Sequence, residues 1–263
     1  MNRGFILLLV LGFLFGGAAV LWLRTGNSPP PAQPPVIEPA PAETAPAPEQ
    51  RFLILAASWQ PAFCEGARNK QECRTQTASR YDATHFALHG LWPQADYCDV
   101  SSVVEQRDRD GRWSQLRPVD LPPALQTRLN ERMPGTRSQL ERHEWTKHGT
   151  CYGANEVVYF ADALALMDAL NGSAVQKLFA DNIGRELTQA RIRQAFDDAF
   201  GVGAGERVRV ACDTDGSREL ISELTIGLYA APGDKPDLGE WIFAARPTRG
   251  GCLRGIVDPA GLQ

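Results

Sequence analysis

Apolar residues fall into short strand-like runs near both ends of the folded part of the chain and into longer helical patterns between them. Two runs, RFLILAASW at 51–59 and THFALHGLW at 84–92, are short, apolar and bounded by turn-forming residues, as strands are. Later, ERVRVACD and RELISELTIGLY flank the turn Asp215-Gly216, which predicts a β-hairpin. Helical character marks the segments 121–133, 138–149, 157–170 and 188–200.

This order of elements favours one fold class. When strands lie at both ends of a domain and helices cluster between them, the expected architecture is α+β with a largely antiparallel sheet. The folded part, residues 51–263, has a length that suits one domain. We therefore predict a single α+β domain with a central, mainly antiparallel β-sheet flanked by helices.

The first fifty residues differ in composition and are predicted to lie outside this domain. Residues 4–23 form an uncharged run between two arginines, long enough as a helix to cross a hydrocarbon core of roughly 30 Å. The run continues past a small-residue cleavage site at 17–19, so an uncleaved anchor is favoured over a cleaved signal peptide. The Pro/Ala-rich stretch after it predicts an extended spacer. The predicted organisation is a signal anchor or signal peptide at 1–25, a linker at 26–50 and a folded domain at 51–263.

Charge and cysteine content narrow the class of protein. The formal net charge of −4 argues against a protein that holds nucleic acid by bulk electrostatics, but it permits an enzyme with a local positive site. Six cysteines follow the N-terminal segment, which indicates three disulfides in an oxidising compartment, with the pairing left open by their spacing. We expect an exported protein, periplasmic or extracellular, held at the inner membrane by residues 4–23 if these are retained.

The densest polar segment is HEWTKHGTC, at residues 143–151 of a predicted helix. Zinc-protease helices carry two histidines four residues apart, whereas here they are five apart and diverge, with no third ligand obviously placed. The plain alternative is a solvated, charged helix face. Cations, a carboxylate and histidines together nevertheless suit a reaction in which a phosphate gains negative charge. Four such side chains share one face within an arc of about 140°: His143, Glu144, Lys147 and His148.

Such a site needs a second proton-transfer group from another segment. Within the helix, Lys147 can neutralise developing charge, and Glu144 is an i,i+4 neighbour placed to orient His148. The remaining histidines, His85 and His89, lie in the predicted strand 84–92 and would share one of its faces. His89 is the better candidate, because the glycine after it permits close approach and the nearby tryptophan offers a flat surface for a base. His85 is interpreted as peripheral or structural.

These segments resemble a known family. FALHGLWPQ and HEWTKHGTC are similar, in order and in spacing, to the two active-site segments of the ribonuclease T2 family of secreted endoribonucleases. SWQPAFC at 58–64 resembles the N-terminal W-x-P-x-x-C segment of that family. The resemblance runs from about residue 51 to 252 and is faint outside these segments. It implies an α+β fold and cleavage of single-stranded RNA without a metal or another cofactor.

The resemblance also implies a reaction and a role for each residue. The 2′-hydroxyl of RNA attacks the adjacent phosphorus, giving a 2′,3′-cyclic phosphate that later opens to a 3′-phosphate, so DNA is excluded. His148 would be the general base and His89 the acid, two labels that sequence allows to be exchanged. His143 would contact the phosphate, Glu144 and Lys147 would stabilise the transition state, and Trp92 and Tyr97 would contact a base.

Disulfides and partners follow from the same resemblance. It implies the pairs Cys64–Cys73, Cys98–Cys151 and Cys212–Cys252. Gln94 and Ser58 depart from base-contacting residues of other members, which leaves base preference open. The expected partners are single-stranded RNA and, through an uncleaved N-terminus, the membrane; we expect no DNA partner and a monomer. Two alternatives remain: a catalytically idle RNA- or partner-binding protein on the same scaffold, and a zinc peptidase.

Overall fold

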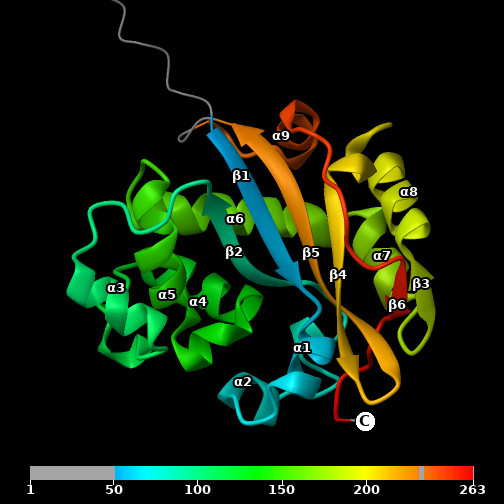
Figure 1. Cartoon of the computed structure of the whole chain (residues 1–263), viewed down its shortest axis with the longest axis horizontal. Helices are drawn as coiled ribbons and strands as arrows, with labels where there is room; N and C mark the ends of the chain where they lie inside the picture. Colours follow the sequence, from blue (N-terminus) through cyan, green and yellow to red (C-terminus); the bar gives the residue numbers. More distant parts are fainter. Residues whose placement is uncertain (1–50, 231–233, 263) are drawn as a thin grey trace, which may run out of the picture. The chain divides into compact units, whose positions relative to one another are not determined.

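The described residues form a mixed α+β domain built on one six-stranded, mainly antiparallel sheet (Figure 1). The computed structural model describes residues 51–230 and 234–262, so the predicted N-terminal anchor and linker lie outside the described ranges. β5 (Arg218–Ala230) is central and pairs antiparallel with β1 (Arg51–Ser58) and with β4 (Val208–Asp215). β1 pairs antiparallel with β2 (Ala87–Pro93). β6 (Arg254–Ile256) pairs in parallel with β5 and antiparallel with β3 (Glu186–Thr188).

The longest helix, α6 (Glu156–Asn171), holds the first two strands in place. Its residues are apolar around most of its circumference, and such a helix is stable only when it is buried. Figure 1 shows α6 running behind the sheet, where Phe160 and Leu164 are fully buried. Its Tyr159 hydroxyl donates to the carbonyl oxygen of Leu91 in β2, at 3.0 Å. This bond fixes the strand that carries the HGLWP segment.

The remaining helices surround the sheet. The predicted helical segments correspond to α4, α5, α6 and α8, but the segment 138–149 is divided, because α5 ends at Lys147 and a 3₁₀ turn follows. The further elements are too short to give a periodic sequence signal. The helices other than α6 are α1 (Gln60–Gly66), α2 (Gln71–Arg74), α3 (Ser102–Arg109), α4 (Pro123–Arg132), α5 (Leu140–Lys147), α7 (Ala174–Ala180), α8 (Gln189–Phe200) and α9 (Leu238–Ala244), with 3₁₀ turns at Tyr81–Ala83, Trp113–Gln115, Pro134–Ser138, Gly149–Cys151 and Ala204–Arg207.

Two irregularities in the sheet lie beside His89 and Glu223. Between β1 and β2, Ala56 pairs with Gly90 and Ala57 pairs with Leu88, which leaves His89 without a partner on β1. A similar shift occurs between β4 and β5 immediately before Glu223. A bulge of this kind bends the strand and redirects the side chains beside it. The two bulges therefore change the direction of His89 and of the residues next to Glu223.

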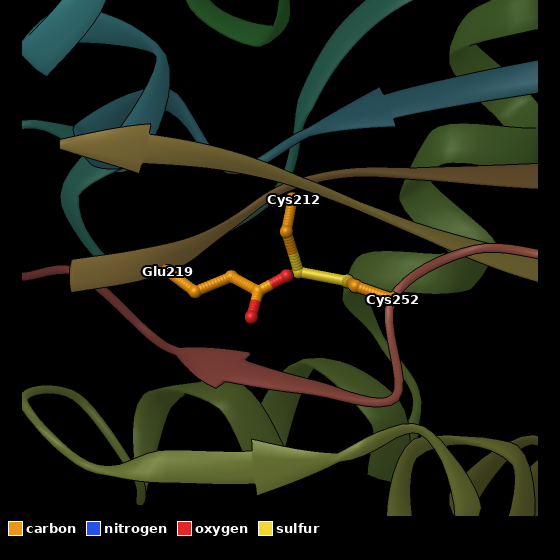
Figure 2. A group of neighbouring side chains, drawn as sticks. All are labelled: Cys212, Glu219 and Cys252. Atoms are coloured by element: carbon orange, nitrogen blue, oxygen red, sulfur yellow. A yellow bond between two sulfur atoms is a disulfide. The ribbon is translucent and has the colours of Figure 1, made fainter. Parts of the chain in front are cut away.

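Three disulfides join Cys64 to Cys73, Cys98 to Cys151, and Cys212 to Cys252, the same pairs that the family resemblance implies. Figure 2 shows the third of them with the carboxylate of Glu219 beside it. In the described part of the chain, these three side chains are the one group of at least three potential metal ligands whose atoms lie within 4.8 Å. Because the two sulfurs are bonded to each other, they are not thiolates and the group is not a metal site.

Within residues 51–230 and 234–262, no helix combines the length and the apolar character that crossing a membrane requires.

Candidate active site

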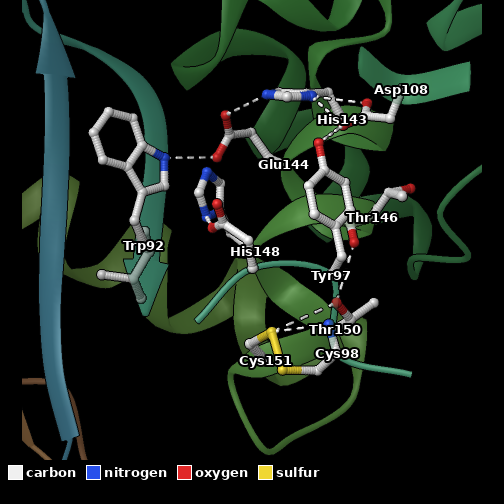
Figure 3. Close-up of polar contacts among 12 residues, drawn as sticks. Trp92, Tyr97, Cys98, Asp108, His143, Glu144, Thr146, His148, Thr150 and Cys151 are labelled. Atoms are coloured by element: carbon white, nitrogen blue, oxygen red, sulfur yellow. Dashed lines mark hydrogen bonds and ion pairs between the residues drawn. A yellow bond between two sulfur atoms is a disulfide. The ribbon is translucent and has the colours of Figure 1, made fainter. Parts of the chain in front are cut away.

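The predicted catalytic side chains lie on β2 and α5, and Figure 3 shows Trp92, Glu144 and His148 close together, with His143 on the other side of Glu144. His89 and Trp92 belong to β2, whereas His143, Glu144 and Lys147 belong to α5, and His148 caps its C-terminus. The His89 ring lies edge-on to the Trp92 indole, with centroids 5.1 Å apart. The His148 ring stacks against the same indole at 5.5 Å. The two predicted proton-transfer groups therefore contact one common side chain.

Glu144 occupies the centre of this arrangement. Its buried carboxylate accepts a hydrogen bond from Trp92 Nε1 at 2.9 Å. The other oxygen lies 3.7 Å from Nε2 of His89 and 3.8 Å from Nε2 of His143. Burial raises the pKa of Glu144, while the two histidines and the indole N–H oppose that rise.

The expectation that Glu144 orients His148 is wrong. His148 is the residue that ends α5, and the chain turns there into a 3₁₀ segment, so its side chain departs from the i,i+4 geometry. Instead, Glu144 contacts His89, His143 and Trp92.

Gly90 makes the position of Glu144 sterically feasible. A Cβ atom at residue 90 would lie 1.9 Å from Glu144 Oε2 and 2.4 Å from Trp92 Nε1. No side chain fits at that distance, so glycine is required for the carboxylate to approach the β2 backbone. The glycine of the HGLWP segment thus permits close approach, as predicted, and the group that approaches is a carboxylate of the protein.

His89 is held by a second carboxylate that the sequence did not point to. Its Nδ1 lies 2.6 Å from Oε2 of Glu223, which also accepts from the Ser58 hydroxyl at 3.1 Å. Desolvation lowers the pKa of His89, but the hydrogen bond to Glu223 and the charges of Glu144 and Glu223 outweigh it and raise the pKa above its usual value. The side chain remains 36% exposed, so it is open to a substrate.

His148 has the opposite electrostatic environment. Its side chain is only 9% exposed, and its Nδ1 forms no hydrogen bond with a described residue, although Asp96 Oδ1 lies 3.0 Å away at an unfavourable angle. Burial and the positive charges of Lys147, His143 and His89 lower the pKa of His148 to about 3. This environment favours the neutral form of the His148 imidazole.

His143 is held by a carboxylate on one side of its ring and an indole stacked against it. Its Nδ1 lies 2.8 Å from Oδ1 of Asp108, a buried carboxylate in α3, and its ring stacks on Trp113 at 4.7 Å. The hydroxyl of Tyr97 donates to the same carboxylate at 2.8 Å. The predicted base contact Tyr97 thus has its hydroxyl committed to Asp108. The His143 and His148 rings meet edge to face at 6.3 Å, a geometry unlike that of two imidazoles converging on a small ion.

Lys147 supplies an ammonium group with no carboxylate partner in the described part of the chain. Its charge lowers the pKa of both His89 and His148, which places it close to both imidazoles. Its backbone carbonyl accepts from the Tyr97 N–H at 2.8 Å. A cation beside two histidines and without a protein counter-ion is suited to bind an anionic group.

Beside His89 lies a cavity of about 430 Å³, large enough for a base. Its lining combines polar and apolar groups from several segments, among them Ser58, Lys70, Leu88, Trp113 and Glu223.

His85 lies outside the candidate active site. The strand predicted at 84–92 begins only at Ala87, so His85 and His89 do not share a strand face. The His85 ring stacks on Tyr81 at 4.0 Å, and its Nδ1 lies 3.1 Å from the Tyr81 carbonyl. His85 therefore has structural contacts outside the site, in line with its interpretation from sequence.

Three functional candidates escaped sequence reasoning: Asp108, Trp113 and Glu223. Glu223 had a weak signal, because it is a carboxylate within the otherwise apolar run of β5. Asp108 and Trp113 had no such signal in the sequence, because α3 and the turn after it are largely polar and neither residue stands out there.

The fold and this site define an α+β ribonuclease with a histidine-based centre, and comparison with known proteins identifies the family. The chain belongs to the ribonuclease T2 family, whose model matches residues 50–236. It is a T2-type ribonuclease. It is 30% identical over 237 residues to Ribonuclease I of Escherichia coli (strain K12), an alignment that covers 79% of this chain and 86% of the relative.

Two further comparisons extend this result. Extracellular ribonuclease LE of Solanum lycopersicum is 29% identical, over 57% of this chain and 65% of its own length. Among solved structures, RNase NT in complex with 5′-AMP is 21% identical with a TM-score of 0.51, covering 80% of this chain and 98% of that chain. That level of similarity demonstrates a common fold.

Proposed function

We propose that this ribonuclease is an endonuclease that cleaves single-stranded RNA in two steps and without a metal. In the first, the 2′-oxygen bonds to the adjacent phosphorus and the bond from phosphorus to the 5′-oxygen breaks, leaving a 2′,3′-cyclic phosphate. In the second, water opens the ring to a 3′-phosphate. The observation that carries the proposal is that His89 and His148 contact one indole and have pKa values shifted in opposite directions.

These shifts support one assignment of roles in the first step. A general base must be neutral at the start, and the lowered pKa of His148 favours this state. A general acid must be protonated, and the raised pKa of His89 favours that state. His148 accepts the proton of the 2′-hydroxyl and His89 donates one to the leaving 5′-oxygen. A bound phosphate adds negative charge, which raises the pKa of His148 towards the working pH.

The charge that develops on the phosphate has its own partners. The Lys147 ammonium, without a carboxylate partner in the described residues, stabilises the pentacovalent transition state. His143 contacts the phosphate through the ring that Asp108 and Trp113 hold in place. Glu144 contributes through its position between His89 and His143.

The base contacts predicted for Trp92 and Tyr97 have to be reconciled with the contacts that these two side chains already make. The Trp92 indole already stacks on His148 and donates to Glu144, so its first role is to organise the site, and a base has to use its remaining surface. Tyr97 acts in the same way through Asp108. The cavity beside His89 offers a space of base size next to the proposed acid.

We infer that the enzyme works outside the cytoplasm. Three disulfides favour an oxidising compartment, periplasmic or extracellular, and one relative is named an extracellular ribonuclease. Anchoring by residues 4–23, a monomeric state and the exclusion of DNA as a substrate complete the proposal.

The test is cleavage of RNA by the purified protein in excess EDTA, with identification of the product ends. We expect cyclic-phosphate ends, and a loss of about 10²- to 10⁴-fold in kcat for each of His89→Ala and His148→Ala. His85→Ala is the matched control and should retain activity. RNA binding without cleavage would instead support the catalytically idle scaffold, and loss of a hydrolytic activity on chelation would support a peptidase or another metalloenzyme.

A further inference from the structure

A second hollow lies at the C-terminal end of β2, directly after Trp92. Pro93, Gln94 and Ala95, which directly follow Trp92, form one of its walls. The rest of its lining includes the start of β1, the end of β5 and four residues of the segment 244–248. The cavity measures about 710 Å³, so it is larger than the one beside His89.

This hollow continues into a third. A cavity of about 300 Å³ shares Thr248 with it and is lined by the segment 248–251, by Leu253 and by two residues of the first turns of α8. The two hollows therefore adjoin at Thr248, and their linings extend from residues 93–95, after Trp92, to the loop 244–253. We call the two hollows together the arginine track.

The charge of the track differs from that of the whole molecule. The chain has a net charge of −4, yet the residues that line the two hollows include no aspartate or glutamate. Arg246 and Arg249 are exposed and form no ion pair with a carboxylate of the described residues. The arginines of the track are Arg51, Arg193, Arg246 and Arg249. Arg51 and Arg193 donate to the backbone carbonyls of Cys151 and Val208. The exposed guanidinium groups of Arg246 and Arg249, in a depression whose lining contains no carboxylate, are suited to phosphate oxygens.

Aromatic rings accompany these charges. Phe52 and Tyr229 lie directly opposite each other on β1 and β5 and both line the larger hollow. Tyr229 is 36% exposed, so its ring is accessible to a ligand. Arginines interleaved with accessible rings are the combination that binds single-stranded nucleic acid, because the rings stack on bases while the cations hold the backbone.

The loop that carries Arg246 and Arg249 is anchored along its length. The Thr248 N–H donates to the Glu206 carbonyl at 2.7 Å, and the Cys252 N–H donates to Val210 in β4 at 2.9 Å. Arg207 Nε donates to the Ala245 carbonyl, and the disulfide from Cys252 to Cys212 closes the segment. A loop held at these points loses little conformational entropy when a ligand binds.

We propose that the arginine track binds the phosphate backbone of single-stranded RNA beyond the cleaved bond. The proposal rests on the proposed function and adds further subsites to it. Its loop, 244–253, follows the segment 50–236 that matches the family model. The track makes long RNA a better substrate than a dinucleotide, through binding and without a change in the chemical step.

The test compares the full-length protein with the double variant Arg246→Gln/Arg249→Gln. The matched control, Arg74→Gln/Arg185→Gln, removes two exposed arginines from outside the track. With a single-stranded 12-mer RNA, we expect the track variant to show a KM raised about tenfold and a weaker salt dependence, since about 0.7 of a counterion is released per phosphate contact. With a dinucleotide, kcat and KM should both match those of the parent protein.

Binding of a 2′-O-methyl 12-mer, which lacks the attacking hydroxyl, separates this proposal from the proposed function. Fluorescence anisotropy should show about tenfold weaker binding by the track variant than by the control. Unchanged affinity for this 12-mer would overturn the proposal, whatever the catalytic result. An equal loss of activity on the dinucleotide would also overturn it, because the substitutions would then be acting on the catalytic centre. Failure of the parent to cleave any RNA would refute the proposed function alone.

Discussion

At the scale of single residues, two identical side chains acquire different chemistry from their surroundings. His89 lies between two carboxylates, Glu144 and Glu223, which raise its pKa. Burial, together with neighbouring cations, lowers the pKa of His148 to about 3. A pair of titratable groups whose pKa values are pushed apart can serve as acid and base at one pH.

Glu223→Gln should reveal which of the two histidines, His89 or His148, is the general acid. The substitution removes a negative charge beside His89, so the pKa of His89 falls towards its ordinary value. A general acid works only while protonated, so the alkaline limb of the profile of kcat/KM against pH should move to lower pH, with the acidic limb unchanged.

Ser58→Ala is the control for this change, because it removes another contact of the Glu223 carboxylate and retains the charge. An alkaline limb at the same pH in Glu223→Gln would show that His89 is not the acid.

At the scale of elements, the site depends on how β2 is joined to α5. Trp92 of β2 donates to Glu144 of α5, and Gly90 leaves room for that contact. After β2, the Tyr97 N–H donates to the carbonyl of Lys147, the last residue of α5, and Cys98 is bonded to Cys151. These contacts hold together a strand and a helix that are remote from each other in the chain.

Cys98→Ser/Cys151→Ser should therefore destabilise the domain strongly. The disulfide spans 53 residues, for which the chain-entropy model gives about 4 kcal/mol. Urea unfolding of the oxidised proteins measures the loss. Cys64→Ser/Cys73→Ser, which removes a bond across only 9 residues, should cost less, about 3 kcal/mol in the same model. The reverse order would show that the contacts around each bond, and not loop closure, set its contribution.

At the scale of the whole molecule, an ionic cluster fastens the C-terminal segment to the sheet. Asp258 is fully buried, its Oδ1 accepts from Arg218 at 2.8 Å and its carbonyl accepts from the Trp59 indole at 2.8 Å. Glu65 and Asp215 also contact Arg218. Burial raises the pKa of Asp258 to about 6, with Arg218 opposing the rise and Glu65 adding to it.

This raised pKa predicts a pH dependence of stability. The folded state holds the Asp258 proton more tightly than the unfolded chain, whose pKa is about 4, so this contribution to stability falls as pH rises from about 4 to about 6. Relative to Asp258→Asn, the parent should lose on the order of 2 kcal/mol of unfolding free energy between pH 4 and pH 7, measured by urea titration.

Asp198→Asn, at an exposed position, is the control: it retains Asp258, so its unfolding free energy should change between pH 4 and pH 7 as that of the parent does. A constant difference between the parent and Asp258→Asn at both pH values would contradict the prediction.

Much of the fold was accessible from sequence because long elements carry a period. The strands β1, β2, β4 and β5 and the longer helices were predicted close to their observed positions. The short helices α1, α2 and α7 and the short strands β3 and β6 were not, because three to seven residues complete too few repeats to show a period.

For the site, sequence identified the five polar residues of the two motifs but not the carboxylates that tune them. Asp108 and Glu223 act on His143 and His89 from other elements, at sequence separations of 35 and 134 residues. The side-chain direction of His89 depends on a bulge, and that of His148 on the end of a helix. Neither feature leaves a pattern in the chain.

The sequence by itself determined the family, the fold class, the long elements and the five motif side chains, because periodicity and motif spacing are local properties of a chain. The tertiary structure decided which carboxylate faces which imidazole, and hence in which direction the pKa of each imidazole is shifted. It also decided where the arginines of the 244–253 loop lie relative to β2. These properties depend on distance and burial, which are set only when remote segments pack together.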